Sequence, residues 1–223
     1  MPTEITTVNA GSLMDAIEYE AMVRKISELT SNLTLRPANQ QDCVHLVLFA
    51  DMATRRLTSY VWGLMATPGQ SSFEVGRNVI RNDESHFTHF RNWRVAEVDG
   101  KLVGALNGYV ISEPSSLPAS TLEAVKPLNE LKEMAAGTWY ISAVAIYPEH
   151  QGSGFGRLLL AEAENLARAA NKDRLTLMVG SFNARAYGLY QKIGFEEWAR
   201  RSFTAFAGSD EPGDWILMVK DLG

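Results

Sequence analysis

The sequence predicts a mixed α/β fold, and three observations support that prediction. Asp99-Gly100 lies between two apolar runs, Trp93–Val98 and Leu102–Ile111, a pattern typical of a β-hairpin. Residues 156–170 instead carry apolar side chains at helical spacing. Strands and helices do not alternate regularly along the chain, which favours a mixed layered arrangement over a simple doubly wound sheet.

The remaining elements follow from local apolar periods and from the glycines and prolines that interrupt them. Pro68-Gly69 breaks a long helical region, and Gly194 is the expected stop of a late helix. Glu164 and Arg168 stand four residues apart and predict an exposed ion pair. In chain order we expect a strand at Asn32–Arg36, helices at Gln40–Met65 and Phe73–Phe87, the hairpin, a helix at Leu122–Met134, a strand at Thr138–Tyr147, a helix at Gly156–Ala170, a strand at Leu175–Val179, a helix at Asn183–Ile193, and strands at Phe195–Phe203 and Trp215–Lys220.

The first residues of the chain predict a separate helix. Ser12 is a candidate cap, and an apolar stripe follows at helical spacing, made of Leu13, Ile17, Ala21, Met22, Ile26 and Leu29. We therefore expect an N-terminal helical extension at 1–30 and one domain at 31–223 with an insertion at 112–137. The stripe must pack either on this domain or on a second copy, so a homodimer is possible.

Composition and charge limit the class of protein. The 223 residues are 46% hydrophobic and 21% charged, which suits a globular domain with a sizeable core. The formal net charge is -5, and the basic pairs Arg55-Arg56 and Arg200-Arg201 are isolated. Phosphate backbones require clustered Lys and Arg, so we expect solvated arginine pairs and no nucleic-acid partner.

Cysteine content and hydropathy indicate a cytoplasmic protein with no membrane partner. The single cysteine, Cys43, excludes an internal disulfide and stands among apolar residues, where a packed structural thiol is expected. No apolar run reaches the roughly 20 residues of a membrane span. The first 20 residues also lack the basic-then-apolar pattern of a signal peptide.

The segment Ile146–Arg157 predicts an anion site. A buried strand ends there, a loop with glycines at 152, 154 and 156 follows, and a helix begins. The first amides of a helix lack internal partners and carry partial positive charge, so they can hold phosphate oxygens. The other interpretation is a tight strand-to-helix connection. The glycine spacing matches neither the dinucleotide fingerprint nor a P-loop, which disfavours a dehydrogenase or a kinase.

Two motifs resemble a known family. Gln151–Gly156 resembles the Gln/Arg-x-x-Gly-x-Gly/Ala signature of the GNAT superfamily of N-acetyltransferases, and Val144–Pro148 resembles the strand that leads into that loop. Asn183–Phe195 is similar to the second family motif, an Asn before a helix that ends Leu-Tyr-x-x-x-Gly-Phe. The resemblance is strong over Thr138–Phe203 and weaker over Leu33–Ile111.

The resemblance implies a fold and a cosubstrate. The fold is GNAT-like, with a mixed, mostly antiparallel central sheet, splayed central strands and flanking helices. Acetyl-CoA would lie where Thr138–Tyr147 and Leu175–Val179 splay apart, with its pyrophosphate on the loop amides and its pantetheine arm along the first strand. The cofactor-binding residues that it implies are Val144, Ala145, Ile146, Gln151, Gly152, Ser153, Gly154, Phe155, Gly156, Arg157 and Asn183.

The resemblance also implies a catalytic residue. Tyr190 would protonate the leaving thiolate as a general acid, unless it only joins the apolar stripe of its helix. Asn183 would contact the cofactor, cap its helix, or do both. Arg157 is either a cofactor contact or an exposed helix residue.

The departure from the family pattern concerns the general base. Tyr140 and Met178 stand where many members carry a glutamate, and Glu113 and His150 are weak substitutes. His86 and His89 lie three residues apart without further ligands, which favours surface histidines, and we expect no metal.

The sequence therefore predicts an acetyl-CoA-dependent N-acetyltransferase that acts on a primary amine of a small-molecule acceptor. An acyl-CoA-binding regulatory module that lost its base is the alternative. The acceptor itself is not specified. Met65–Phe73 and Ser112–Gly137 are the segments expected to shape its pocket.

Overall fold

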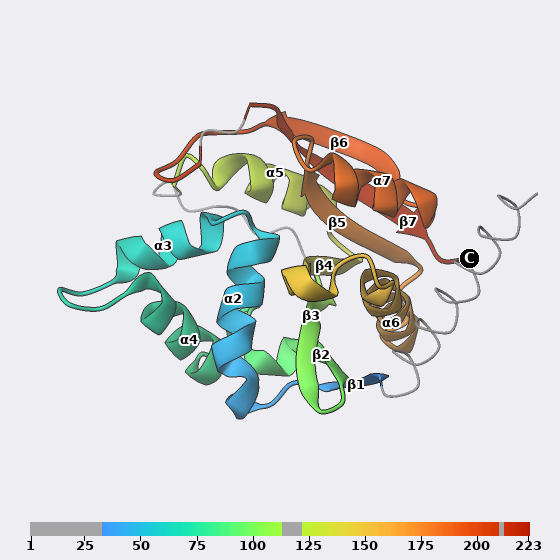
Figure 1. Cartoon of the computed structure of the whole chain (residues 1–223). Helices are drawn as coiled ribbons and strands as arrows, with labels where there is room; N and C mark the ends of the chain where they lie inside the picture. The colour runs from blue at the N-terminus through green and yellow to red at the C-terminus, as the bar shows by residue number, and fades with distance from the viewer. Residues whose placement is uncertain (1–32, 113–121, 210–211) are drawn as a thin grey trace, which may run out of the picture.

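The computed structural model describes residues 33–112, 122–209 and 212–223 (Figure 1). The predicted extension at 1–30 and residues 113–121 of the predicted insertion lie outside the described residues. Within the described ranges, no helix combines the length and apolar character needed to cross a membrane.

The described residues form a seven-stranded sheet in the spatial order β1-β2-β3-β4-β5-β7-β6. Its strands are β1 (Leu33–Pro37), β2 (Trp93–Val98), β3 (Lys101–Val110), β4 (Trp139–Ile146), β5 (Arg174–Gly180), β6 (Glu196–Ser202) and β7 (Asp214–Asp221). Neighbouring strands run antiparallel except for β4 and β5, which are parallel. The expected mixed, mostly antiparallel sheet is confirmed.

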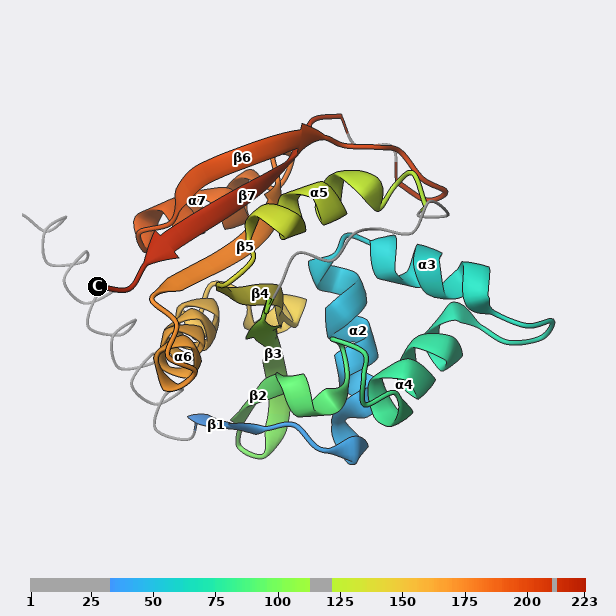
Figure 2. The ribbon, with the colours of Figure 1, turned by 180° about the vertical axis from the view of Figure 1, so that it is seen from behind.

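Helices cover both faces of this sheet. On one face, α6 (Phe155–Ala169) packs on β3, β4 and β5, and α7 (Ala184–Lys192) packs on β5. On the other face, α2 (Cys43–Ala53) packs on β3 and β4, and α5 (Lys126–Met134) packs on β6 and β7. Figure 2 shows α5 in front of the strands and α7 behind them.

The helical region predicted over Gln40–Met65 is not one helix. It consists of the 3-10 turn η1 (Gln40–Asp42), α2 and α3 (Leu57–Met65). Arg55 and Arg56 break it, because their φ angles of 53° and 74° are left-handed. The amide of Arg56 bonds back to the carbonyl of Asp51 at 3.1 Å, which closes α2. Apolar residues continue on both sides, so periodicity alone missed the break.

The helix predicted at Phe73–Phe87 is α4 (Ser72–Asn82), which packs on α2 and α3. Ser71 and Glu74 form a capping box at its start. It ends early because the carboxylate of Asp83 accepts the amide of Ser85 at 3.1 Å, a local bond that competes with the helix.

The hairpin prediction is confirmed, whereas one predicted ion pair is wrong. Asp99 and Gly100 adopt φ angles of 51° and 72°, as a tight hairpin turn requires. Glu164 accepts Lys220 Nζ at 2.6 Å, and Arg168 donates to the carbonyl of Leu222 at 2.6 Å. Both side chains therefore attach α6 to the C-terminal strand rather than to each other.

The face under α5 has its own apolar cluster, here called the α5 cluster. Its buried members are Ile111, Leu131, Ala135, Tyr140, Trp215 and Leu217. Phe182, Phe203 and Met178 pack against it. This cluster matters for the site because it brings β4, β5 and β7 together.

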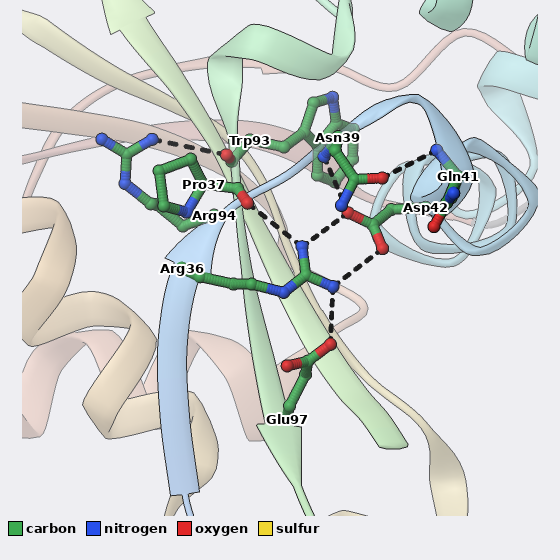
Figure 3. Close-up of polar contacts among 8 residues, drawn as sticks. All are labelled: Arg36, Pro37, Asn39, Gln41, Asp42, Trp93, Arg94 and Glu97. Carbon is green, nitrogen blue, oxygen red and sulfur yellow. Dashed lines mark hydrogen bonds and ion pairs between the residues drawn. The ribbon is translucent and has the colours of Figure 1, made fainter. Parts of the chain in front are cut away.

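Arg36 on β1 joins the 3-10 turn η1 to the neighbouring strand β2 (Figure 3). Its guanidinium donates to the carboxylate of Asp42 at 2.7 and 3.0 Å and to Glu97 on β2 at 2.5 Å. The Asp42 side chain is only 6% exposed. Burial alone would raise the pKa of Asp42, but hydrogen bonds from Arg36 and from the Asn39 amide outweigh it and lower that pKa. The charged pair therefore fixes η1 against β1 and β2.

Candidate functional site

The two parallel strands separate partway along their length. They pair only at Trp139–Leu175, Tyr140–Thr176 and Ile141–Leu177. Beyond Ile141, β4 continues beside β3 and β5 continues beside β7. A V-shaped gap therefore opens between β4 and β5 at the position that the family resemblance implies.

A β-bulge marks the point of separation. The register between β3 and β4 shifts after Asn107, which pairs with Ala143, while Gly108 pairs with Ile141. Ser142 is thus the extra residue on β4. Bulges bend a strand and occur next to active sites, so this one accounts locally for the departure of β4 from β5.

The backbone of Val144 and Ile146 faces the gap. The amide of Tyr147 donates to Val103 on β3 at 2.9 Å. Bonding alternates along an antiparallel ladder, so Ala145 also bonds to β3, whereas Val144 and Ile146 direct their amides and carbonyls away from it. These are the groups that an extended ligand arm could pair with.

One cavity of about 710 Å³ is lined by every residue that the sequence indicated for cofactor binding and by the candidate acid Tyr190. Those residues are Val144, Ala145, Ile146, Gln151, Gly152, Ser153, Gly154, Phe155, Gly156, Arg157, Asn183 and Tyr190. They come from β4, the following loop, α6 and α7. The gap between β4 and β5 thus opens into the cavity that the loop lines.

The loop has a backbone geometry that could hold an anion. Gly152 and Gly154 have φ angles of 87° and 86°, a conformation that glycine adopts without strain. A Cβ atom at Gly154 would meet nothing within 4 Å, so space lies beside the backbone. Among the described residues, the amides of Gly152, Ser153 and Gly154 have no backbone acceptor. These amides and the first amides of α6 fit a pyrophosphate.

Gln151 connects both sides of the gap. Its Nε2 donates to the carbonyl of Ile146 at 3.1 Å, and its Oε1 accepts from Arg185 at 3.2 Å. Arg185 lines the cavity and adds positive charge beside the loop. Sequence reasoning missed Arg185, although a basic residue two positions after the motif asparagine was an available signal.

Tyr190 lies half-buried in the cavity wall. Burial raises its pKa to about 12, so the phenol keeps its proton at neutral pH. Its ring also packs on Phe195 at a centroid distance of 5.9 Å, so it belongs to the core as well as to the cavity. Asn183 caps α7 by accepting the amide of Ala186 at 3.3 Å, and it lines the cavity too.

The described lining contains no carboxylate. Met178 lines the cavity, and Tyr140 is buried in the α5 cluster, where desolvation raises its pKa. His150 lines the cavity, whereas Glu113 lies outside the described residues. No described carboxylate in the lining therefore takes the place of the missing glutamate, and His150 is the base candidate from the sequence that lines the cavity.

The histidine pair differs from the expectation of surface residues. His89 is 2% exposed, and His86 is partly buried with its Nδ1 2.7 Å from the Thr88 hydroxyl. Within the described residues, no group of three His, Cys, Asp or Glu side chains is arranged to hold a metal. Cys43 is buried as expected, and burial raises its thiol pKa.

The far side of the cavity comes from segments that the sequence did not indicate. Met52, Ala53 and Arg55 at the end of α2 line it, as does Trp215 on β7. The described lining contains no residue of the 65–73 segment that was expected to shape the acceptor pocket. Arg55, expected to be merely solvated, is placed there by the left-handed break after α2.

Known proteins resemble this chain over part of its sequence. A mycothiol acetyltransferase of Kocuria rhizophila is 40% identical over 58 residues, 26% of this chain and 19% of that protein. A putative ribosomal protein bS18-alanine N-acetyltransferase of Bacillus subtilis is 32% identical over 79 residues, 35% of this chain and 52% of that protein. The chain thus spans about a fifth of the length of the first relative and about half of the length of the second.

A solved structure and a family profile match a larger part of this chain than those two relatives do. The structure of yncA from Salmonella typhimurium, described as a putative acetyltransferase with its cofactor acetyl-CoA, has a TM-score of 0.54 at 20% identity, covering 86% of this chain and 95% of that one. That likeness shows the shared fold. The profile of the acetyltransferase (GNAT) family matches residues 60–195. Because this match spans more than half of the chain, the protein belongs to the acetyltransferase (GNAT) family.

Proposed function

We propose that this protein is an acetyl-CoA-dependent N-acetyltransferase that acetylates a primary amine of a small-molecule acceptor by direct attack. The observation that carries this proposal is the separation of β4 from β5 beyond Ile141, into a cavity lined by the glycine loop. An open strand edge and an anion cradle in one cavity suit a ligand with an extended arm and a pyrophosphate.

The binding residues divide between two tasks. The amides of Gly152–Gly156 would hold the pyrophosphate, whereas the amide of Arg157 donates to the carbonyl of Gly154 at 3.0 Å. The side chains of Arg157 and Arg185 would add charge at the cavity wall. Val144 and Ile146 would pair with the pantetheine arm as an added strand. Acetyl-CoA would supply a thioester as the acyl donor. In the net reaction, a bond from the amine nitrogen to the acetyl carbon forms and the carbon–sulfur bond breaks. The ammonium form of the amine loses two protons, one of which ends on sulfur and the other in solvent.

Tyr190 would act as the proton donor to sulfur. Its pKa of about 12 means that Oη carries its proton throughout the neutral range. A thiol titrates near 8.5, well below the raised pKa of this phenol, so complete proton transfer from Tyr190 to the thiolate is uphill. Tyr190 would therefore contribute chiefly by a hydrogen bond that strengthens as negative charge develops on sulfur.

A non-catalytic acyl-CoA-binding module is the second candidate. The observation that favours it is the absence of Asp and Glu from the described lining of the cavity. Against it stands Tyr190, which lines the same cavity and keeps its proton. An amine that reaches the site in its neutral form would need no carboxylate base.

The named relatives support the donor but not one acceptor. One is named for mycothiol and the other for the alanine of a ribosomal protein, and both match only in part. What these names share is acetyl transfer. The acceptor of this chain must therefore be read from its own cavity.

Thiol release from acetyl-CoA, measured across a panel of amines, tests the proposal. Amine-dependent release above the rate of acetyl-CoA hydrolysis supports an N-acetyltransferase. Binding of acetyl-CoA with no amine-dependent release would support the regulatory module instead. A melting temperature that rises with ATP but not with coenzyme A would contradict both the N-acetyltransferase and the acyl-CoA-binding module.

A further inference from the structure

Met178 is a partly exposed side chain in a strand that is otherwise buried. From Leu175 to Gly180, every residue of β5 except Met178 is buried. β5 is an inner strand of the sheet, between β4 and β7, where side chains are normally covered on both faces. Met178 also lines the cavity, so the cavity accounts for the part of this side chain that the protein leaves uncovered.

Met178 lies on the opposite face of the sheet from its neighbours in β5, because side chains alternate along a strand. Leu177 and Val179 belong to the core under α6, which also contains Phe155 at the start of that helix. Met178 packs instead against the α5 cluster. Leu177, Met178 and Val179 all line the cavity, so the gap between β4 and β5 opens to both faces of the sheet. The glycine loop occupies the α6 face, which leaves the other face for the acceptor.

A second apolar edge borders the cavity on the face that α2 and α5 cover. Met52 and Ala53 at the end of α2 are partly exposed and line the cavity. They pack against a separate core that contains Phe49 and Ala143. Two apolar cores of this face therefore each leave a methionine partly uncovered at the same cavity.

Uncovered apolar surface favours an apolar ligand, because a group that covers it also leaves water. Methionine suits such a wall, since its unbranched thioether chain adapts to ligands of different shape. The apolar group belongs to the acceptor rather than to the cofactor, because the proposed contacts to the cofactor lie at the gap and on the α6 face.

We infer that the acceptor amine carries an apolar substituent that lies between Met52 and Met178, and that Met178 is a specificity-determining residue. This inference rests on the proposed function, because it names the class of amine that the reaction takes. That class is an alkylamine or arylalkylamine without a second charged group. The amine nitrogen reaches the thioester through the gap, while the apolar substituent stays on the face that α2 and α5 cover.

The test uses primary n-alkylamines from propylamine to hexylamine, together with hexamethylenediamine, which matches hexylamine in length but ends in a second charge. kcat/KM is measured by thiol release at saturating acetyl-CoA. For the wild-type protein it should rise about threefold with each added methylene group, as expected when that group is buried. Hexylamine should exceed the diamine at least tenfold, because the charged end of the diamine would enter an apolar wall.

Variants of the two methionines test whether this wall sets the preference. Met178→Gln keeps the length of the side chain but adds an amide, so it should lower kcat/KM for hexylamine about tenfold and for propylamine much less. Met52→Gln should act in the same direction, and Met178→Leu should keep the wild-type preference. Met65→Gln is the matched control, because Met65 is 58% exposed and lies outside the cavity lining. Melting temperatures show that each variant is folded.

Three results would overturn the inference. One is wild-type turnover that does not increase with chain length or is faster with the diamine. Another is a folded Met178→Gln protein with the wild-type dependence on chain length. The last is a strong preference for butyryl-CoA over acetyl-CoA, which would assign the apolar wall to the acyl donor.

The same measurements separate this inference from the proposed function. Thiol release with polar amines but not with alkylamines would contradict the inference and leave an N-acetyltransferase. Binding of acetyl-CoA without thiol release for any amine would contradict both.

Discussion

Arg185 on α7 donates a 3.2 Å hydrogen bond to the side-chain oxygen of Gln151, the first residue after the short η3 turn (Pro148–His150). Gln151 in turn donates to Ile146 at the end of β4. This bond joins the two motifs of the family across the open gap. It places a guanidinium beside the loop that we propose to bind pyrophosphate.

Arg185→Gln should weaken coenzyme A binding about 2–5-fold, because an exposed charge contributes up to about 1 kcal/mol. The loss should diminish as salt is added. Isothermal titration calorimetry at low and high salt measures both the loss of affinity and its salt dependence. Lys192→Gln, at the other end of α7, serves as the control, and an equal loss there would indicate only a general charge effect.

Gly154→Val should weaken coenzyme A binding at least tenfold, because its φ of 86° is strained for a branched residue and the loop must shift to relieve it. Gly69→Val is a matched control, since Gly69 also has a φ of 86° and open space around it but lies outside the cavity lining. That variant should lose similar stability and keep its affinity. Unchanged affinity for coenzyme A in a folded Gly154→Val protein would show that this loop does not bind the pyrophosphate.

Tyr190→Phe should lower kcat about 10²–10³-fold with little change in acetyl-CoA affinity, because its hydrogen bond acts on charge that develops during the reaction. Tyr187→Phe on the same helix should have no such effect, because Tyr187 Oη contacts Gln191 and lies outside the cavity lining. With a pKa of about 12, Tyr190 should cause no loss of kcat between pH 7 and 10 in a pH profile. Full turnover of the variant at every pH would end the assignment.

Asp42→Asn should destabilise the fold by about 2 kcal/mol at pH 7, because charge-assisted hydrogen bonds are lost at a mostly buried carboxylate. The folded-state pKa of Asp42 is lowered, so its contribution is complete above the unfolded value near 3.9 and disappears as pH falls through the folded value. Urea unfolding from pH 7 to pH 3 should therefore show the two proteins converging. Asp221→Asn, which breaks an exposed pair with Arg174, should cost about 0–1 kcal/mol at any pH.

Deletion of residues 1–30 should change either molar mass or melting temperature, because the apolar stripe of this segment must be buried somewhere. Loss of a dimer in light scattering would identify a subunit interface. A lower melting temperature at unchanged mass would identify docking on the same chain. If neither changes, the periodicity of this segment carries no structural meaning.

Several structural elements of this protein are determined by short local patterns in its sequence. The hairpin at Asp99-Gly100, the loop at Gln151–Gly156 and the capped helix after Asn183 are each specified by residues within about a dozen positions. Glycines at left-handed positions and capping side chains act on the backbone next to them, so their effects are readable without the fold. The loop residues and the residues of α7 line one cavity, however, only because the fold brings α7 beside the loop.

Tertiary structure alone decided which distant groups meet. No local pattern pairs Glu164 with Lys220, breaks the helix at Arg55, or brings Trp215 and Phe182 beside that arginine. Local sequence determined the glycine loop and the start of α6 because a contiguous stretch of backbone forms them. The acceptor side depends on strand order and packing between separate elements, where a side chain bonds to whichever partner the register brings within reach.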